Sequence, residues 1–121
     1  MILSIDTSSD PYKFALYLPK KLEKEYDGLR DDKKDALFFI DKILKQNKLD
    51  INNINAIAVF RGPGSFTGVR VGISIANALS FAQNIPVFGF SGEKYQGKPL
   101  LMAKDAAKGK LRSKKIITPI Y

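Results

Sequence analysis

The alternation of apolar and polar positions predicts that strands come first along the chain and helices later. Residues 1–6 form a short apolar run that ends in Asp6 and precedes the turn-rich stretch TSSDP, which indicates a buried strand followed by a loop. Residues 12–18 alternate and are rich in aromatic side chains, which indicates a second strand, and residues 21–26 could form a third. The first part of the chain is therefore expected to form a meander of strands.

From Asp31 or Asp32 the pattern changes to a helical period, which predicts an amphipathic helix to about Asn47. The apolar positions of this expected helix are Leu37, Phe38, Ile40, Ile43 and Leu44. Lysines occupy many of the intervening positions, so we expect the opposite face of the helix to be solvated.

The second half of the chain alternates between strand and helix. A capping-like region at Asp50 leads into an apolar strand over 56–60, and a helix is expected over 66–83. The short run 85–90 is introduced by a proline and predicts a last strand. The predicted order is β-β-β-α-β-α-β, which gives a mixed sheet with helices packed on it.

A glycine-rich stretch, FRGPGSFTGVRVG at 60–72, joins the strand at 56–60 to the following helix. It matches neither the Walker A pattern nor the dinucleotide-binding pattern, because the required lysine is missing and the third glycine comes one residue late. Gly62 and Gly64 permit backbone angles that other residues avoid. Ser65 or Thr67 can cap the helix, whose first amides favour an anion nearby. An anion-binding turn and a simple chain reversal into a tightly packed helix therefore both remain open.

Small residues form one flank of the helix expected over 66–83. Gly68, Gly72 and Ala76 recur every four residues and leave this flank nearly without side chains. The adjacent apolar positions are Val69, Ile73 and Leu79. Glycine costs about 1 kcal/mol in a helix interior relative to alanine, so two glycines indicate that something packs closely against them. This neighbour could lie within the chain or across an interface.

The composition limits the chemistry that the chain can perform. Its 121 residues suffice for one domain, and an apolar fraction of 45% is typical of a globular protein. Neither cysteine nor histidine occurs, which excludes disulfides, thiolate zinc sites, a cysteine nucleophile and a histidine base. Any chemistry that the chain performs alone would therefore use carboxylates, hydroxyls or lysines, and no histidine or cysteine can bind a metal. The apolar runs are too short to span a membrane and the start does not resemble a signal peptide, so a cytoplasmic protein is expected.

The positive charge is concentrated late in the sequence. Residues 1–92 carry 12 basic and 10 acidic side chains, a net of +2, and residues 93–121 carry 8 and 2, a net of +6. Such a segment could contact the phosphates of a nucleic acid or could form a solvated surface. The candidate residues for phosphate contacts with a nucleic acid are Lys104, Lys108, Lys110, Arg112, Lys114 and Lys115, with Lys94 and Lys98 before them. The stretch PLLMAKDAAKGKLRSKK could form a basic helix.

Two stretches and their separation resemble a known family. They are ILSIDTSS at 2–9 and INAIAVFRGPGSFTGVRVGISIANALSFAQNIPVFGFS at 54–91. Their strand, their GPGSFTG-V-R-V-G helix and their closing IPV-x-G-x-S strand resemble the TsaB family, also called YeaZ. This family belongs to the bacterial machinery that makes N6-threonylcarbamoyladenosine in tRNA. The resemblance covers residues 1 to about 92 and is specific in its motifs.

The resemblance implies an α/β fold of the ribonuclease-H-like, actin-like ATPase type. This chain would hold only the N-terminal half of that fold, as an actin-like domain over 1–92 followed by a basic segment over 93–121 that could contain a helix and a terminal strand. Members of the family commonly carry a second domain of related fold. The ending ITPIY resembles the terminal segment of longer relatives. We therefore expect an internal deletion of the second domain.

The resemblance also implies partners. TsaB proteins are described as non-catalytic and pair through helices with TsaD, the subunit that transfers the threonylcarbamoyl group, and the ATPase TsaE joins the complex. For this chain it implies a heterodimer with TsaD. The expected partner-interface residues are Gly68, Val69, Gly72, Ile73, Ala76 and Leu79. A homodimer through the same flank is an alternative, and no membrane partner is expected.

In the ATPase superfamily, the end of the first strand lies beside the nucleotide phosphates. The candidate phosphate-binding residues are therefore Asp6, Thr7, Ser8, Gly62, Gly64 and Ser65. The alternative is a local turn in which the side chains satisfy their own backbone amides. No cofactor is firmly implied, because half a cleft should bind ATP or ADP poorly.

Three functional hypotheses follow. The leading one is a non-catalytic scaffold that binds TsaD and supports formation of N6-threonylcarbamoyladenosine. The second is an ATPase-like protein that binds nucleotide at the turn around Asp6. The third is a tRNA-binding accessory that uses the basic segment after residue 92.

Overall fold

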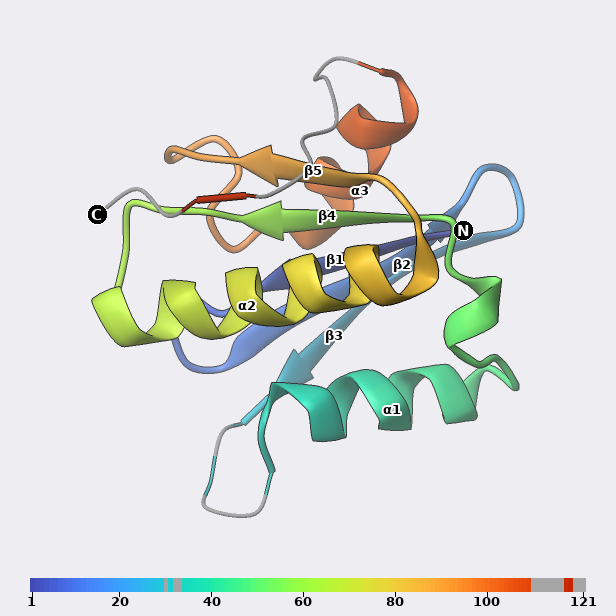
Figure 1. The fold of residues 1–121 in the computed structure, drawn as a ribbon, viewed down its shortest axis with the longest axis horizontal. Coiled ribbons are helices and arrows are strands. Elements are labelled where there is room, and N and C mark those ends of the chain that lie inside the picture. Colours follow the sequence, from blue (N-terminus) through green and yellow to red (C-terminus); the bar gives the residue numbers. More distant parts are fainter. Residues whose placement is uncertain (30, 32–33, 110–116, 119–121) are drawn as a thin grey trace.

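One mixed sheet organises the computed structural model, which describes residues 1–29, 31, 34–109 and 117–118 (Figure 1). The sheet contains five strands among these residues, in the order β3-β2-β1-β4-β5. They are β1 (Ile2–Asp6), β2 (Tyr12–Leu18), β3 (Leu22–Gly28), β4 (Ala56–Phe60) and β5 (Val87–Phe90). The first three strands pair antiparallel as a meander, and β1, β4 and β5 run parallel. The carboxyl ends of the three parallel strands therefore meet at one edge of the sheet.

Helices cover both faces of this sheet. Helices α1 (Ala36–Gln46) and α2 (Phe66–Gln83) lie side by side over one face, and α3 (Pro99–Ala107) lies behind the sheet in the view of Figure 1. A single 3-10 turn, Ile51–Asn53, leads into β4 and begins with a capping box at Asp50. The result is a three-layer arrangement of helix, sheet and helix.

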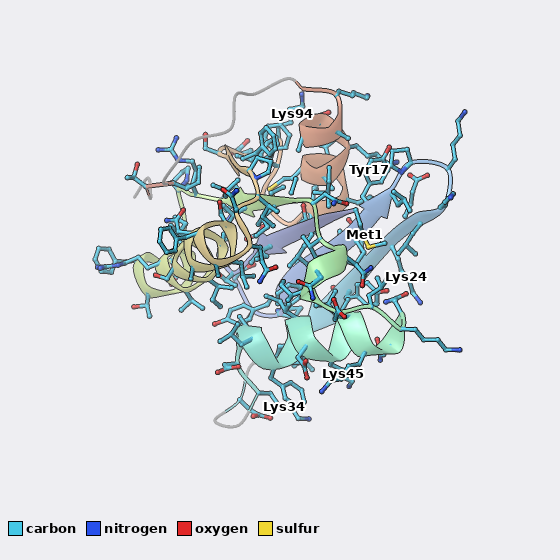
Figure 2. The ribbon with its side chains drawn as sticks, turned by 45° about the vertical axis from the view of Figure 1, so that its right-hand side comes forward. Met1, Tyr17, Lys24, Lys34, Lys45 and Lys94 are labelled. Carbon is cyan, nitrogen blue, oxygen red and sulfur yellow. The ribbon has the colours of Figure 1, made fainter. Side chains whose placement is uncertain are left out.

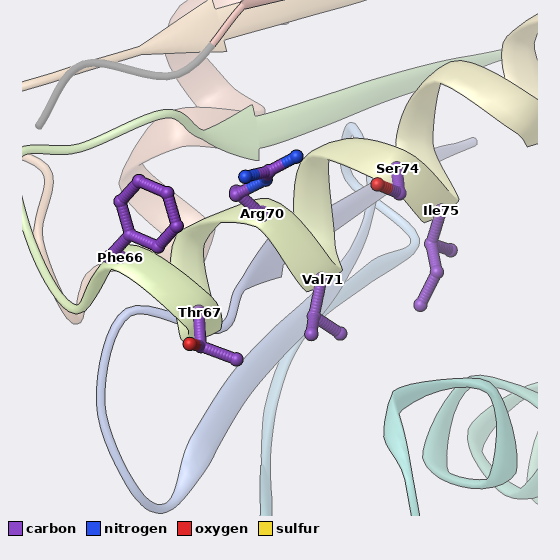
Figure 3. Close-up of a pocket in the computed structure, with 6 residues that line it drawn as sticks. All are labelled: Phe66, Thr67, Arg70, Val71, Ser74 and Ile75. Carbon is purple, nitrogen blue, oxygen red and sulfur yellow. The ribbon is translucent and has the colours of Figure 1, made fainter.

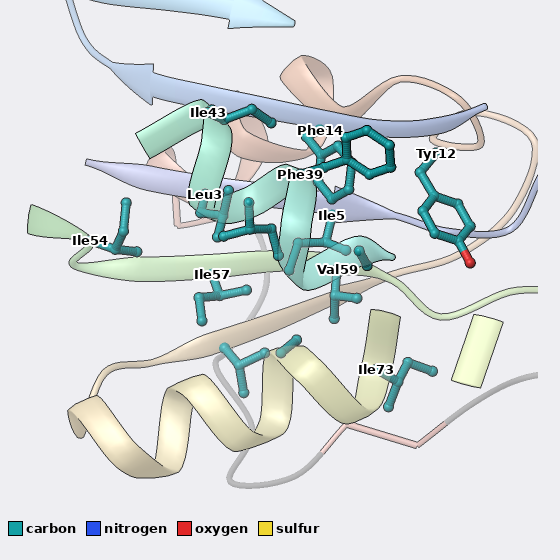
Figure 4. Packing of buried hydrophobic residues seen from close by; sticks show 14 of the residues in the cluster. Leu3, Ile5, Tyr12, Phe14, Phe39, Ile43, Ile54, Ile57, Val59 and Ile73 are labelled. Carbon is teal, nitrogen blue, oxygen red and sulfur yellow. The ribbon is translucent and has the colours of Figure 1, made fainter. Parts of the chain in front are cut away.

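Alternation along the strands divides the core into two clusters. The larger cluster lies between the sheet and helices α1 and α2 (Figure 4). Leu3, Ile5 and Val59 belong to it, and the neighbouring positions face the other way because side chains alternate along a strand. The smaller cluster lies under α3 and consists of Ala58, Phe60, Phe90, Met102 and Ala106. Both clusters pack against β1 and β4, one on each face of the sheet, and these two strands are buried along most of their length.

The structure confirms the predicted order of strands and helices along residues 1–92 and the bounds of α2, but it corrects the first helix. Helix α1 begins at Ala36, later than Asp31 or Asp32, because Asp35 is the N-cap and accepts a hydrogen bond of 2.9 Å from the Phe38 amide. Its buried residues are Ala36, Phe39, Ile40, Ile43 and Leu44. Leu37 and Phe38, which were expected on the apolar face, are 53% and 40% exposed.

The segment after residue 92 contains a helix that packs on the sheet. Helix α3 starts with Pro99 and contacts β1, β2 and β4. Of the longer basic helix that the sequence suggested, the structure shows the part up to Ala107, after which Gly109 adopts a φ of 69°. The expected terminal strand around ITPIY lies largely outside the described residues.

Candidate functional site

Three loops converge where β1, β4 and β5 end. They follow Asp6, Phe60 and Phe90, so the candidate phosphate-binding residues are brought together as the parallel strands require. The amide of Gly92 donates to the carbonyl of Gly62 at 3.2 Å, which joins the second and third loops. A Cβ atom added to Gly64 would lie 3.0 Å from the Ser8 Cβ atom, so the first and second loops are also in close contact.

The carboxylate of Asp6 is 1% exposed and is bonded on both oxygens. Its Oδ1 atom accepts from the Ser8 amide at 2.9 Å and from the Ser8 hydroxyl at 2.6 Å. Its Oδ2 atom accepts from the Gly97 amide at 2.6 Å. Gln96 also reaches this cluster, because its Nε2 atom lies 3.4 Å from the Ser8 hydroxyl. Asp6 therefore ties the first loop to the segment that leads into α3.

The glycine-rich turn reverses the chain and caps α2. The Gly62–Pro63 peptide bond is cis, and Gly62 has a φ of 108°, a conformation that favours glycine. Ser65 is confirmed as the N-cap, because its hydroxyl accepts from the Gly68 amide at 3.2 Å. The packing role of this turn is thus visible in its contacts, and phosphate binding by Gly62, Gly64 and Ser65 stays a prediction.

The Thr7 side chain bonds to the backbone of α2. In a regular helix the Gly72 amide donates to the Gly68 carbonyl four residues earlier. The Gly72 amide also donates to the Thr7 hydroxyl at 2.9 Å, and that hydroxyl donates to the Gly68 carbonyl at 2.5 Å. The hydroxyl of Thr7, the residue after β1, therefore bridges these two backbone groups, and the two glycines provide the room for it.

The small-residue flank of α2, which was predicted to contact a partner, faces this chain's own sheet. The residues buried on this side are Gly68, Val69, Gly72, Ile73 and Ala76. A Cβ atom on Gly72 would lie 2.6 Å from the Thr7 Oγ1 atom and 3.3 Å from the Ile5 Cγ2 atom, so nothing else can approach there. Leu79, the sixth predicted interface residue, is half-buried and packs against the main core.

The opposite side of α2 is open and largely apolar (Figure 3). It forms a shallow hollow of about 490 Å³ lined by Phe66, Thr67, Arg70, Val71, Ser74 and Ile75. These residues make two adjacent rows along the helix, each with a spacing of four residues. Phe66 is 56% exposed, and the Arg70 guanidinium carbon lies 5.1 Å from the centre of its ring. Val71 and Ile75 are half-buried and also pack against the main core, so Phe66 is the exposed large apolar side chain among these residues.

The positive charges are not gathered on one described surface. In Figure 2, Lys34 and Lys45 lie by α1, Lys24 lies on β3, and Lys94 lies near α3. Of the candidate tRNA-binding residues, Lys104 forms an ion pair of 2.7 Å with Glu23, which raises the pKa of the lysine above its ordinary value. Lys108 is exposed at the end of α3. Lys110, Arg112, Lys114 and Lys115 lie outside the described residues.

The hydrogen bonds that Ile117 and Thr118 make with Asn77 of α2 and with Arg61 were not predicted. The Asn77 side chain donates to the Ile117 carbonyl and accepts from the Ile117 amide, both at 2.9 Å. Arg61 donates to the Thr118 carbonyl at 2.8 Å. Ile117 is 2% exposed and sits where Gly89 has no side chain. Only the polar Asn77 in an otherwise apolar helix face hinted at this contact.

Two kinds of feature bear on the site, namely membrane-spanning helices and groups of acidic side chains that could hold a metal ion. None of the helices in the described part of the chain is long and apolar enough to cross a membrane. No three acidic side chains among the same residues are grouped closely enough to hold a metal ion. The site is therefore characterised by packing contacts and by the exposed hollow on α2.

Comparison with known sequences gives consistent relatives. The model of the family TsaD, tRNA N6-adenosine threonylcarbamoyltransferase, matches residues 24–92. The tRNA threonylcarbamoyladenosine biosynthesis protein TsaB of Buchnera aphidicola subsp. Schizaphis graminum is 33% identical over 121 aligned positions, which cover 92% of this chain and 58% of that protein. The chain spans about half the length of the curated TsaB relatives that it matches.

Comparison with solved structures supports the same conclusion. YeaZ from Pseudomonas aeruginosa aligns with a TM-score of 0.66 and 31% identity, over 74% of this chain and 42% of that one. RuvC from T. thermophilus, in complex with a Holliday junction substrate, aligns with a TM-score of 0.57 over 93% of this chain and 98% of that one. At 11% identity the RuvC match shows the fold alone. The two neighbours confirm the expected ribonuclease-H-like, actin-like ATPase fold.

Proposed function

Because the chain belongs to the TsaB (YeaZ) family, we propose that it is a non-catalytic subunit that binds a TsaD-type transferase and supports formation of N6-threonylcarbamoyladenosine in tRNA. The TsaB relative is named for this biosynthesis. The observation that supports a binding role for this chain is the open apolar hollow on α2. TsaE would then join through the complex rather than through this chain alone.

The hollow has the properties of a docking surface. Exposed apolar side chains that lie together, rather than singly, mark places where a partner removes them from water. Phe66 is exposed, and the half-buried Val71 and Ile75, which also pack against the main core, lie on the same side of α2 within about two and a half turns of helix. On the neighbouring α1, Leu37 and Phe38 add exposed apolar surface in the first turn. The two helices lie on the same face of the sheet, so one partner surface can contact both (Figure 1).

Nucleotide binding is less well supported than partner binding. Both oxygens of the Asp6 carboxylate already accept hydrogen bonds from this chain, and the Gln96 and Gly97 segment lies against Ser8. A nucleotide at this position would have to displace that segment. If this chain binds ATP or ADP with saturation, either alone or with the transferase, the scaffold proposal must be extended to a nucleotide-binding role.

The test is co-purification of this chain with the TsaD-type transferase of the same organism, followed by a transfer assay with tRNA, ATP and threonylcarbamoyl adenylate. Phe66→Lys should abolish the complex because it replaces the exposed aromatic side chain of the hollow with a charge. Asn52→Lys, which adds the same charge at an exposed position outside α2, serves as the matched control and should bind normally. The proposal fails if the wild-type chain forms no complex, or if Phe66→Lys co-purifies as well as the control.

A further inference from the structure

Arg70 is the only charged residue that lines the hollow on α2. The other lining residues are Phe66, Thr67, Val71, Ser74 and Ile75. The Arg70 guanidinium lies over the Phe66 ring, with its central carbon 5.1 Å from the ring centre. Among the described residues, no carboxylate lies within ion-pair distance of Arg70. The guanidinium is therefore held in place by an aromatic ring and lacks an anionic partner within the described part of its own chain.

A surface that covers the hollow removes water from this guanidinium. Arginine stays charged at any pH that proteins tolerate, so it cannot avoid the cost of desolvation by losing its proton. A buried cation without a partner is strongly unfavourable, whereas a carboxylate can accept two parallel hydrogen bonds from the planar guanidinium. The Phe66 ring lies near the guanidinium, whose N–H groups can donate to a carboxylate of the partner.

We propose that the partner surface carries a carboxylate side chain opposite Arg70, flanked by apolar side chains that contact Phe66, Val71 and Ile75. This inference rests on the proposed function, because it describes the partner that the same hollow binds. It names the chemistry of that partner as an apolar surface with one central anion.

The charge of Arg70 also distinguishes a partner that carries a carboxylate from a second copy of this chain. Helix α2, with the sequence FTGVRVGISIANALSFAQ, contains neither aspartate nor glutamate. A pair of copies that joined through their α2 helices would bury two arginines and would supply no carboxylate from either helix. Arg70 therefore favours a different partner over a self-pairing that joins α2 to α2, because it adds a repulsive term to that complex.

The experiment measures the affinity of the TsaD-type transferase for wild-type, Arg70→Met and Arg70→Lys chains at several salt concentrations. Arg70→Met keeps the apolar stem and should weaken binding by about tenfold or more, with less dependence on salt than the wild type. Arg70→Lys keeps the charge but loses the bidentate geometry, so its affinity should lie between the two. Lys21→Met, in the exposed turn before β3, is the control and should behave as the wild type.

The outcomes distinguish this inference from the proposed function. If the wild-type chain binds the transferase, and Arg70→Met binds equally well with the same dependence on salt, the carboxylate is refuted and the scaffold role stands. If the wild-type chain does not bind at all, both are overturned. Analytical ultracentrifugation of Arg70→Met alone gives a second readout: self-association should become tighter than in the wild type, and unchanged self-association overturns the role of Arg70 against self-pairing.

Discussion

Replacement of Gly72 by alanine tests whether the Thr7 hydroxyl bridges the two backbone groups of α2. In a solvated helix this change should stabilise the protein by about 1 kcal/mol, because alanine is the better helix former. Here the added Cβ atom would lie 2.6 Å from the Thr7 Oγ1 atom and 3.3 Å from the Ile5 Cγ2 atom. Overpacking of this kind costs about 2 kcal/mol, and displacement of the bridging hydroxyl costs about 1 kcal/mol more. The expected net effect of Gly72→Ala is therefore a destabilisation of about 2 kcal/mol.

The double mutant gives the sharper result. In a Thr7→Ala background the hydroxyl is absent, so the added Cβ atom finds space. Gly72→Ala should then be nearly neutral or slightly stabilising, which gives a coupling of about 2 kcal/mol between the two sites. Gly68→Ala is the matched control, because its Cβ atom would meet the backbone carbonyl of Thr7, which no substitution at position 7 removes.

Urea unfolding followed by circular dichroism measures these free energies. The reasoning is refuted if Gly72→Ala stabilises the otherwise unchanged chain, as helix propensity alone requires. It is also refuted if the two substitutions add within about 0.5 kcal/mol, which is the behaviour of independent sites.

Three further predictions concern stability. The Ser4 hydroxyl is buried and has no hydrogen-bond partner in the described structure, so Ser4→Ala should leave the free energy of unfolding unchanged or raise it by up to about 1 kcal/mol, as urea unfolding will show. Asp6→Asn places an N–H group against the donors of Ser8 or Gly97. It should lower the free energy of unfolding by about 2 kcal/mol, which urea unfolding will show as a lower midpoint. The Glu23 hydrogen bond raises the pKa of Lys104, so its contribution is present below pH 10.5 and is lost as pH rises through the raised value. The stability difference between the wild type and Glu23→Gln should therefore disappear in strongly alkaline solution.

The regular elements were predictable because their signals are local. A period of two or of about 3.6 residues, together with Ser65 at the start of α2, is sufficient to predict β1, β2, β4 and α2. In α1, Asp35 rather than Asp31 or Asp32 caps the helix. This moves the start of the helix, and it leaves Leu37 and Phe38 exposed.

The side of α2 that is turned away from the sheet was not predictable from the same signals. The spacing of Gly68, Gly72 and Ala76 shows that they share a flank, but it does not show whether their neighbour is the sheet or another protein. The decisive contact is made by Thr7, which lies 65 residues before Gly72 and carries no local mark of its role. The contact between Asn77 and Ile117 spans 40 residues and is equally invisible to periodicity.

The positions of these two contacts in the sequence also determine the order in which they can form during synthesis. Helix α2 is held by Thr7, which is made before it, and by Ile117, which is made after it. During synthesis the helix can form locally as soon as residue 83 has emerged, whereas contacts between distant residues come later and more slowly. A growing chain therefore presents the outward side of α2 on a helix that is not yet fully anchored. The contacts that hold α2 are complete only when residue 117 has been made.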